Sequence, residues 1–400
     1  MVQVAVLGYG TVGSGVVEVL ENNKKMITPR AGEELNVKYI LDLRDFPGDP
    51  YESKVVHDVN VILEDPEIRV ICETMGGINP AYDFSKKALM AGKSVCTSNK
   101  ELVAAHGPEL LRLAKENKCN YLFGASVGGG IPIIRPINYS LTAEKIESIH
   151  GILNGTTNYI LTKMDKEGAD FEEVLKEAQE KGYAERNPEA DVEGHDACRK
   201  IAILSSLMTG KYVKYEDIYT EGITKITSAD FKYAKALNKS IKLLAMSKDE
   251  GDGYMAMVSP CMISQEHPLY CVSDVFNAVF VHGNMLGDSM FYGRGAGKLA
   301  TASAVVADVI DSARHLGKTV TCIWDEEVVS LKDYKDSAKK FFVRVKNEGA
   351  DKAASLFGYI EKIEVVDGEF GFVTEVMTER EFASKVEQLP EMITRIRVEF

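Results

Sequence analysis

The stretch that decides the fold is the N-terminal run Val2-Gln-Val-Ala-Val-Leu-Gly-Tyr-Gly-Thr-Val-Gly13. Its uncharged, β-branched beginning predicts a buried parallel strand. The strand ends in Gly8-x-Gly10-x-x-Gly13, and apolar residues at helical spacing follow. In that setting the three glycines favour a tight turn, a close approach of the backbone to a pyrophosphate, and close packing of a helix whose N–H groups face the anion. The sequence therefore predicts a dinucleotide-binding βα unit at the start of the chain.

Strand-like and helix-like segments alternate after this turn. Further strands are expected at residues 36–41, 70–77 and 94–100, with a helix at 81–91. The βαβαβα order favours a Rossmann-type, doubly wound parallel sheet with right-handed crossovers. Ligands bind beyond the carboxyl ends of such strands, which is where Thr74, Ser98 and Lys100 fall.

The end of the second predicted strand is where a dinucleotide enzyme selects its cofactor. An acidic residue there accepts a hydrogen bond from the ribose of NAD, whereas an arginine accommodates the 2′-phosphate of NADP. This chain offers Asp42, Arg44 and Asp45 together. The sequence leaves the choice between NAD and NADP open, and a solvated charged turn is a further alternative.

Composition narrows the class of protein. A chain of 400 residues is expected to form two or three domains. Its net charge of −13 argues against a nucleic-acid partner. No apolar run approaches 18 residues, and the N-terminus lacks the features of a signal peptide, so we expect a cytoplasmic protein with no membrane partner. The seven cysteines form no CxxC pair, which predicts reduced thiols and neither a zinc site nor a disulfide framework.

A glycine-dense loop follows the strand predicted near Tyr121. Consecutive glycines at 128–130 leave carbonyl groups free to converge on sodium or potassium, although a plain tight turn explains them equally well. Beyond Pro136 the pattern changes, because residues 146–153 alternate like a strand of a second sheet. The polar run Asn154-Gly-Thr-Thr-Asn158 then opens a helix.

The stretch predicted to carry the chemistry lies between residues 171 and 208. Glu185, Asp191, Asp196 and Lys200 crowd around a loop-to-helix junction that is flanked by Gly182 and Gly194. Taken alone, an Asp and a Lys four residues apart are usually a surface ion pair that contributes about 0.2–0.5 kcal/mol. The crowding of carboxylates around a lysine instead favours an active site for a small charged substrate.

The C-terminal part predicts a separate small domain. A glycine loop at 293–297 precedes an Ala/Val-rich helix at 301–316, which we expect to pack back on the nucleotide domain. A charged linker is followed by strands at 341–345, 360–366, 370–375 and 393–399 and helices at 353–357 and 379–387. This βαββαβ order is ferredoxin-like, and without a catalytic cluster it indicates an interaction or ligand-sensing module.

The set of motifs resembles homoserine dehydrogenase, in its longer bacterial form with a C-terminal ACT domain. The resemblance rests on Gly8-Tyr-Gly-Thr-Val-Gly13, Thr97-Ser-Asn-Lys100, Asn154-Gly-Thr-Thr-Asn-Tyr159, Gly182-Tyr-Ala-Glu185, Asp191-x-x-Gly-x-Asp196-x-x-x-Lys200 and Gly293-x-Gly-Ala-Gly297. It implies a nucleotide-binding domain at 1–136 completed by 300–320, an α+β catalytic and dimerisation domain at 137–299, a linker at 321–337 and an ACT-like regulatory domain at 338–400. It also implies reversible, NAD(P)-dependent interconversion of L-homoserine and L-aspartate 4-semialdehyde in threonine, methionine and isoleucine biosynthesis.

The resemblance further implies a role for individual residues. Lys200 would be the proton donor and acceptor, Lys100 would polarise the same site, and Asp196 would orient the substrate and Lys200. Substrate contacts are assigned to Glu185, Asp191, Thr156 and Tyr183. Cofactor contacts are assigned to Gly8, Tyr9, Gly10, Thr11, Val12, Gly13, Arg44, Thr74, Ser98, Lys100, Gly182 and Gly297. The backbone carbonyls of Val127, Gly129 and Ile131 would hold a monovalent cation, but Gly124 stands where the family has a glutamate ligand, so the ion is expected to be held more weakly or replaced by water.

Two other functions remain open at this stage. One is another NAD(P)-dependent amino-acid or semialdehyde dehydrogenase with the same nucleotide domain, and the other is a nucleotide-sensing regulator. The expected partners are a small-molecule substrate, an amino-acid effector at the ACT-like domain and further copies of the chain in a dimer or tetramer.

Overall fold

The computed structural model describes residues 1–399, and its contacts divide the chain into two compact units. The first comprises residues 1–145, 202–215 and 293–329; the second comprises residues 146–201, 216–292 and 330–400, described to residue 399. The three predicted domain boundaries stay predictions. Each unit is described by itself below.

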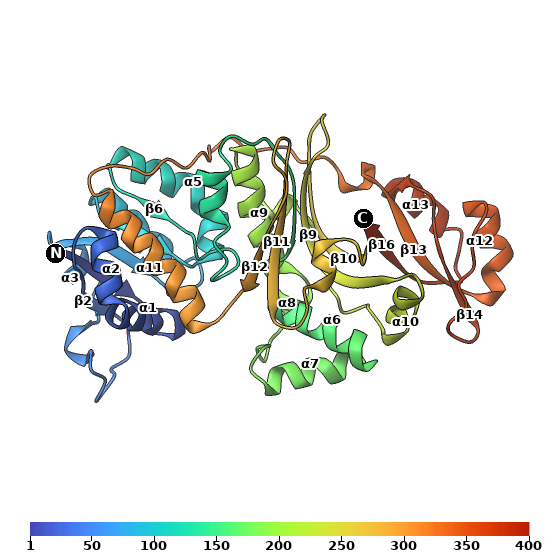
Figure 1. Ribbon diagram of the computed structural model, residues 1–400, viewed down its shortest axis with the longest axis horizontal. Helices are drawn as coiled ribbons and strands as arrows, with labels where there is room; N and C mark the ends of the chain where they lie inside the picture. The colour runs from blue at the N-terminus through green and yellow to red at the C-terminus, as the bar shows by residue number, and fades with distance from the viewer. Residues whose placement is uncertain (400) are drawn as a thin grey trace. The chain divides into compact units, whose positions relative to one another are not determined.

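The first unit contains a six-stranded parallel sheet with the strand order β3-β2-β1-β4-β5-β6 (Figure 1). This order and the intervening helices confirm the doubly wound parallel sheet predicted from the sequence. Its elements are β1 (Val2–Leu7), α1 (Thr11–Asn22), α2 (Lys24–Ala31), β2 (Leu35–Leu41), β3 (Val55–Val56), α3 (Asn60–Leu63), β4 (Ile68–Glu73), α4 (Ala81–Met90), β5 (Ser94–Thr97), α5 (Lys100–Glu116), β6 (Tyr121–Leu122) and α11 (Lys298–Arg314).

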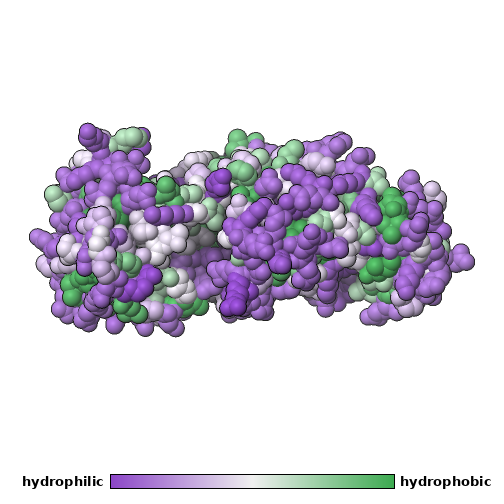
Figure 2. All heavy atoms as spheres, turned by 90° about the horizontal axis from the view of Figure 1, so that it is seen from below, coloured by the Kyte–Doolittle hydropathy of each residue, from purple (hydrophilic) through white to green (hydrophobic). Residues whose placement is uncertain are grey.

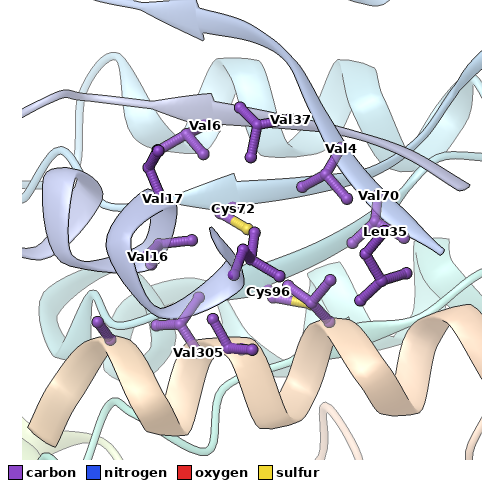
Figure 3. Close-up of a cluster of buried hydrophobic side chains, with 14 of the residues drawn as sticks. Val4, Val6, Val16, Val17, Leu35, Val37, Val70, Cys72, Cys96 and Val305 are labelled. Atoms are coloured by element: carbon purple, nitrogen blue, oxygen red, sulfur yellow. The ribbon is translucent and has the colours of Figure 1, made fainter. Parts of the chain in front are cut away.

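The core of this unit joins the N-terminal strands to a helix from far along the chain. Figure 3 shows Val4 and Val6 of β1, Val16 of α1 and Val305 of α11 pointing into one apolar cluster. All four are fully buried. As predicted, the Ala/Val-rich helix near residue 300 packs on the nucleotide-binding sheet, because its apolar face supplies the cover that the sheet needs.

The second unit is built on one long mixed sheet. Its strand order is β12-β11-β7-β9-β10-β16-β13-β14, so the strands of the predicted C-terminal domain continue the sheet of the catalytic region. The elements up to residue 294 are β7 (Ile146–Ile152), α6 (Gly155–Glu167), α7 (Phe171–Glu180), α8 (Glu189–Val192), α9 (His195–Thr209), β8 (Tyr219–Thr220), α10 (Ser228–Ala236), β9 (Lys239–Asp249), β10 (Tyr254–Ser264), β11 (Phe276–Gly283) and β12 (Gly287–Arg294). Of these, α9 from residue 202 and β12 from residue 293 belong to the first unit. The remaining ones are β13 (Ala338–Lys346), α12 (Ala350–Phe357), β14 (Glu369–Val373), β15 (Met377–Thr378), α13 (Glu379–Val386) and β16 (Met392–Glu399).

One predicted strand of the C-terminal region is wrong. Residues 360–366 make only a single bridge, between Ile363 and Gly371. None of the side chains at 360–366 is fully buried, and that of Val365 is 38% exposed. A strand of a half-buried sheet needs a buried face, which this segment lacks. The other predicted strands and helices of this region are present within about three residues of their expected bounds.

The surface agrees with the acidic, charged composition. On the face drawn in Figure 2, hydrophilic residues predominate and hydrophobic ones form separate small patches. Among residues 1–399, none of the helices combines the length and apolar character that a membrane span requires.

Candidate active site

The glycine turn after β1 has the geometry that a dinucleotide-binding turn requires. Gly8 adopts φ +87°, a conformation that residues with a side chain rarely adopt. A Cβ on Gly13 would lie 1.8 Å from the carbonyl oxygen of Gly8, so only glycine lets α1 approach the turn. A Cβ on Gly10 would meet nothing within 4 Å, and Gly10 is the N-cap of α1. The N-terminus of α1, with Thr11 and Val12 in its first turn, is thus free to receive an anion.

A cavity of about 480 Å³ adjoins this turn. Its lining includes five of the residues predicted to contact a cofactor or select it, namely Gly8, Gly10, Asp42, Arg44 and Thr74. Met75, Pro80 and Phe84 also line it. They could not be predicted as site residues, because apolar residues in a loop or a helix have many other roles. The lining residues follow or flank the carboxyl ends of β1, β2 and β4, where ligands of such sheets bind.

Asp42 and Arg44 form a single unit at the end of β2. The Arg44 Nε and Nη2 atoms donate to the two carboxylate oxygens of Asp42, at 3.0 Å each. The backbone N–H of Tyr9 donates to Asp42 Oδ2 at 2.8 Å. The hydrogen bond from Arg44 and those from backbone N–H groups hold the pKa of Asp42 well below its ordinary value. Asp42 therefore ties the glycine turn to the exposed guanidinium of Arg44.

Residues at the ends of β4 and β5 form a second polar network in the first unit. Thr74 Oγ1 lies 2.9 Å from the carbonyl oxygens of both Leu7 and Gly8, so it fixes the glycine turn. Ser98 lies in the short connection between β5 and α5, where its N–H donates to the Glu73 carbonyl at 3.4 Å. Lys100 is the half-buried first residue of α5, whose N-cap is Asn99.

A buried glutamate stabilises this network through hydrogen bonds. Glu73, which is fully buried, accepts from Thr97 Oγ1 at 2.6 Å, and burial raises its pKa. Thr97 Oγ1 accepts in turn from the N–H of Asn99 at 2.9 Å. The chain from Glu73 through Thr97 to Asn99 fixes the point at which α5, and so Lys100, begins.

The predicted cation loop is buried and tightly packed. Val127, Gly129 and Ile131 are all buried, and Gly129 adopts φ +53°. The Ile131 carbonyl already accepts from the Ile133 N–H at 2.9 Å. A Cβ on Gly129 would lie 2.6 Å from the carbonyl oxygen of Gly295, which precedes α11. Among residues 1–399, no group of three or more His, Cys, Asp or Glu side chains is arranged to hold a metal ion.

Gly124 lies beside a carboxylate from α11. Its N–H donates to Asp308 Oδ2 at 2.7 Å, and a Cβ at this position would lie 2.9 Å from Asp308 Oδ1. Asp308 also pairs with Arg135 Nη2 at 3.0 Å. Burial raises the pKa of Asp308 to about 6, although the charge of Arg135 opposes the shift. The space next to Gly124 is thus occupied by a structural carboxylate that already has a cationic partner.

The lysine and carboxylates predicted to carry the chemistry meet in the second unit. Lys200 Nζ donates to Asp196 Oδ2 at 2.6 Å and to the Leu153 carbonyl at 2.7 Å. Lys200 is 9% exposed and Asp196 is 5% exposed, so the surface ion pair that the spacing alone suggests is wrong here. A buried ion pair needs further hydrogen bonds to offset the loss of hydration, and Leu153 supplies one of them.

Asn154 supplies further hydrogen bonds to two of the carboxylates, and it was not among the site residues predicted from the sequence. Its Nδ2 donates to Asp191 Oδ1 at 2.7 Å and to Asp196 Oδ2 at 2.8 Å. Its Oδ1 accepts from the N–H of Thr157, which makes Asn154 the N-cap of α6. The polar run predicted the cap, but the two carboxylates come from residues 37 and 42 positions later and only the fold brings them there.

Of the remaining predicted substrate residues, Tyr183 and Glu185 lie on an exposed loop after α7, and Thr156 lies at the start of α6. Thr156 Oγ1 donates to the Tyr183 carbonyl at 2.6 Å. The Tyr183 ring is 45% exposed and packs edge-on against Tyr159. Gly182 adopts φ +72° with open space around it, and the Glu185 side chain is exposed, outside the buried network.

Gly297 belongs to the first unit, as the N-cap of α11. It adopts φ +125°, and a Cβ there would meet nothing within 4 Å. Close packing begins one turn further along α11. A Cβ on Gly130 would lie 3.0 Å from the Cβ of Ala300.

Family models match most of the chain. Residues 8–124 match the model described as "Homoserine dehydrogenase, NAD binding domain", and residues 132–310 match "Homoserine dehydrogenase". The chain belongs to the homoserine dehydrogenase family. It is therefore an NAD(P)-dependent oxidoreductase whose substrates are small molecules, as the sequence predicted.

Individual members of the family show the same likeness. The homoserine dehydrogenase of Bacillus subtilis is 41% identical over 327 residues, which cover 80% of this chain and 75% of that protein. The structure of a homoserine dehydrogenase from Thiobacillus denitrificans superposes with a TM-score of 0.90 at 35% identity and covers 100% of this chain and 98% of that one. A hyperthermophilic archaeal homoserine dehydrogenase in complex with NADPH matches 78% of this chain and 97% of its own, with a TM-score of 0.67 and 29% identity.

Proposed function

We propose that the chain interconverts L-homoserine and L-aspartate 4-semialdehyde, with NAD or NADP, in the biosynthesis of threonine, methionine and isoleucine. One observation carries the proposal beyond family membership. Lys200 is a buried ammonium held by Asp196 at 2.6 Å, with Asn154 and Asp191 completing the cluster. A carbonyl that receives hydride becomes an alkoxide, so the reaction needs a positioned proton donor of this kind.

Individual residues of the chain are proposed to carry out the proton transfer and to position the reacting groups. When bound, the nicotinamide supplies or takes the hydride. Lys200 Nζ gives a proton to the new alkoxide oxygen and recovers one from water. In the reverse direction, Nζ first releases a proton to water and, as the neutral amine, takes the hydroxyl proton. Asp196 keeps the ammonium pointed at that oxygen, because it accepts one of the three Nζ hydrogens and the Leu153 carbonyl accepts a second. By the family resemblance, Lys100 would polarise the substrate carbonyl.

The substrate's amino-acid end is assigned to the exposed loop and its neighbours. The Glu185 carboxylate binds the α-ammonium, and Asp191 supports the constellation. The hydrogen of Thr156 is engaged by Tyr183, so its oxygen serves as an acceptor for the substrate. By the family resemblance, Gly182 and Gly297 would leave room for the nicotinamide, and the absence of any atom within 4 Å of a Cβ at either position suits that role.

The nucleotide is assigned to the turn at residues 8–13 and to the cavity beside it. The N–H groups at the N-terminus of α1 would hold the pyrophosphate, Asp42 and Arg44 would bind the adenosine ribose, and Thr74 and Ser98 would contact the nicotinamide half. Both cofactors are compatible with this pair, because Asp42 can accept from a ribose hydroxyl and Arg44 can bind a 2′-phosphate. The archaeal family member whose structure contains NADPH supports the proposal that NADP can be the cofactor.

The residues at the predicted cation loop do not fit a tightly bound ion. Three neutral carbonyls would have to hold it, and that of Ile131 already accepts an N–H. The carboxylate closest to Gly124, Asp308, is paired with Arg135. A hard cation prefers a fuller set of oxygen ligands. We therefore keep the expectation of weak binding or replacement by water and assign the ion no step.

The C-terminal region is proposed as an ACT-like module that responds to an amino acid, and threonine suits a feedback effector of this pathway. A dimer or tetramer is proposed from the resemblance to the family. Thermal shifts with threonine, isoleucine and methionine test the first idea on the full chain.

The deciding experiment measures homoserine oxidation with NAD and with NADP, with aspartate and malate as competing substrates. Lys200→Ala is expected to lower kcat by roughly 10²–10⁴-fold, the usual size of general acid–base effects, with cofactor binding nearly unchanged. Lys163→Ala is the matched control, since it also removes a lysine from an i,i+4 helical ion pair, with Glu167, but outside the cluster. Wild-type turnover in Lys200→Ala, or no oxidation of homoserine with either cofactor, would overturn the proposal.

A further inference from the structure

The last strand of the chain belongs to the catalytic sheet. β16 pairs in parallel with β10, with Arg397 opposite Cys261, and antiparallel with β13. In Figure 1, β10, β16 and β13 follow one another in the sheet. The C-terminal module and the catalytic region therefore share a continuous set of backbone hydrogen bonds, and β16 is the strand at which they join.

β16 carries an arginine with no exposed surface. Arg397 is 0% exposed, and its Nε and Nη2 atoms donate to the carboxylate of Glu379, at the start of α13. Its Nη1 donates to Glu221 Oε2 at 2.6 Å, outside the C-terminal module. A buried guanidinium shared by two carboxylates in this way links the two regions by charge as well as by backbone pairing.

Glu221 is held almost entirely from the C-terminal strand. Besides Arg397, it accepts from Arg395 Nη1 at 3.0 Å and from the hydroxyl of Tyr219 at 3.1 Å. Burial alone would raise the pKa of Glu221, but the charges of Arg397 and Arg395 hold it below its ordinary value. Glu221 thus stays charged because β16 is in place.

The residues that follow Glu221 pack against the turn between α8 and α9 and form hydrogen bonds with it. A Cβ on Gly222 would lie 2.2 Å from the Val192 carbonyl oxygen, so no side chain fits between the two backbones. The Ile223 N–H donates to the Val192 carbonyl at 2.8 Å, and Thr224 Oγ1 donates to Glu193 at 3.1 Å.

The same segment also covers the other side of the turn. A Cβ on Gly194, at φ +83°, would lie 3.1 Å from the Thr220 side chain. Gly194 immediately precedes α9, and its N–H donates to the Asp191 carbonyl at 3.0 Å. The segment at 220–224 therefore sets the position of the backbone that carries Asp191 on one side and Asp196 and Lys200 on the other.

We propose that Arg397 is a positioning residue for the Asp191–Asp196–Lys200 cluster and acts through Glu221. The inference rests on the proposed function. The C-terminal module then helps to build the active site, in addition to any role in sensing a ligand. Weakening the Arg397–Glu221 contact leaves a half-buried carboxylate without its strongest partner. Glu221 and the Gly222 backbone then move, and the α8–α9 turn moves with them, because that packing leaves no free space.

The structure offers a matched control in the same module. Arg344 of β13 is also buried and pairs with Glu369 of the same module at 2.8 Å. It joins the module to the catalytic region through Asp230 at 2.7 Å and Thr227 Oγ1 at 3.0 Å. Asp230 lies on α10, which packs on β9 and α6. Lys235 of α10 reaches Asp165 in the last turn of α6, at the opposite end of that helix from Asn154. Arg344 thus reproduces the chemistry of Arg397 without a contact to the α8–α9 turn.

The experiment compares Arg397→Lys and Glu221→Gln with Arg344→Lys in the full chain. A lysine keeps the charge but cannot bridge two carboxylates as the planar guanidinium does, and the Gln variant leaves no cavity. Both variants of the Arg397–Glu221 pair should lower kcat by about 10–100-fold, the scale for a misplacement of about 1 Å. KM for the cofactor should stay within about twofold by the same reasoning. Arg344→Lys should lower Tm by a similar amount and keep the wild-type kcat.

Hydrogen exchange supplies a readout that does not need turnover. The amides of residues 191–199 should exchange faster in Arg397→Lys and Glu221→Gln than in Arg344→Lys, and the double variant should be no worse than the worse single one. Equal losses of kcat and equal exchange in the two arginine variants would reduce Arg397 to a structural role and overturn the proposal. A wild-type chain inert toward homoserine would overturn the proposed function instead, while the exchange pattern would still decide the inference.

Discussion

The glycine turn after β1 allows a sharp test, because two of its glycines are required for different reasons. In Gly13→Ala, the new Cβ would lie 1.8 Å from the Gly8 carbonyl oxygen and 2.8 Å from Thr74 Oγ1. An ordinary non-bonded contact is about 3.5 Å, so the first turn of α1 must retreat by roughly 1.7 Å. Overpacking of this kind costs about 1–3 kcal/mol of unfolding free energy.

The retreat also withdraws the N–H groups that face the pyrophosphate. Losing one charge-assisted hydrogen bond of about 1.5–3 kcal/mol weakens cofactor binding by about 10–150-fold. In Gly10→Ala, nothing lies within 4 Å of the new Cβ and the backbone is already extended, so Tm should not change. Its methyl group points into the space proposed for the pyrophosphate, so cofactor affinity should still fall by about tenfold or more, for the loss of one such bond.

Fluorescence titration with NADH and NADPH measures the affinity, and thermal unfolding measures Tm. Gly13→Ala should lose both affinity and Tm, whereas Gly10→Ala should lose affinity alone. Wild-type affinity and Tm in Gly13→Ala would refute the close-packing argument. A fall in Tm for Gly10→Ala as large as that for Gly13→Ala would show that the open space at Gly10 is not what the geometry implies.

Four further predictions follow from other contacts. Arg44→Ala should weaken NADPH binding by at least about tenfold and NADH binding little, because only the phosphate needs the guanidinium; the two dissociation constants measure this. Asn154→Asp keeps the α6 cap but replaces the donor to two carboxylates by a third one; kcat should fall by about tenfold or more, and the acid limb of its pH profile should move upward, because like charges raise carboxyl pKa values. Asp308 has a folded-state pKa of about 6, against an ordinary value of 3.8. Its contribution to the free energy of unfolding is therefore complete below pH 3.8 and is lost as the pH rises through 6. Denaturant unfolding should show that the free energy of unfolding of Asp308→Asn rises by roughly 3 kcal/mol relative to that of the wild type between pH 4 and pH 7. A chain ending at Ser337 should aggregate in light scattering, because removal of β16 uncovers the edge of β10.

The first unit could be predicted closely because its signals are local. The glycine spacing at residues 8–13, the alternating strands and helices, and the turn residues all act within about 30 residues, the size of a βαβ unit. Even the packing of the helix near residue 300 followed from its apolar composition. The strand predicted at 360–366 is wrong because its signal was local but the deciding property was not. The apolar residues of this segment favour a strand, whereas the lack of a buried face depends on how the module folds.

The cluster proposed to be catalytic lies between these extremes. The residue types and the four-residue spacing of Asp196 and Lys200 pointed to the right helix face, but the same spacing describes a surface pair. Burial decided between the two, and the buried pair contacts Leu153 and Asn154, which connect β7 to α6. Asn154 was visible as a helix cap, whereas its two carboxylate partners were not.

The sequence by itself determined the nucleotide-binding turn, the parallel sheet, the acidic character of the chain and the residue set that marks the family. Local backbone conformation and side-chain chemistry suffice for these, since each depends on neighbours in the chain. Only the tertiary structure decided that Lys200 is buried, that Asn154 joins two carboxylates, that Asp308 fills the space beside Gly124 and that the last strand completes the catalytic sheet. Those contacts join residues tens to hundreds of positions apart, and no periodicity or spacing records which of them the packing brings together.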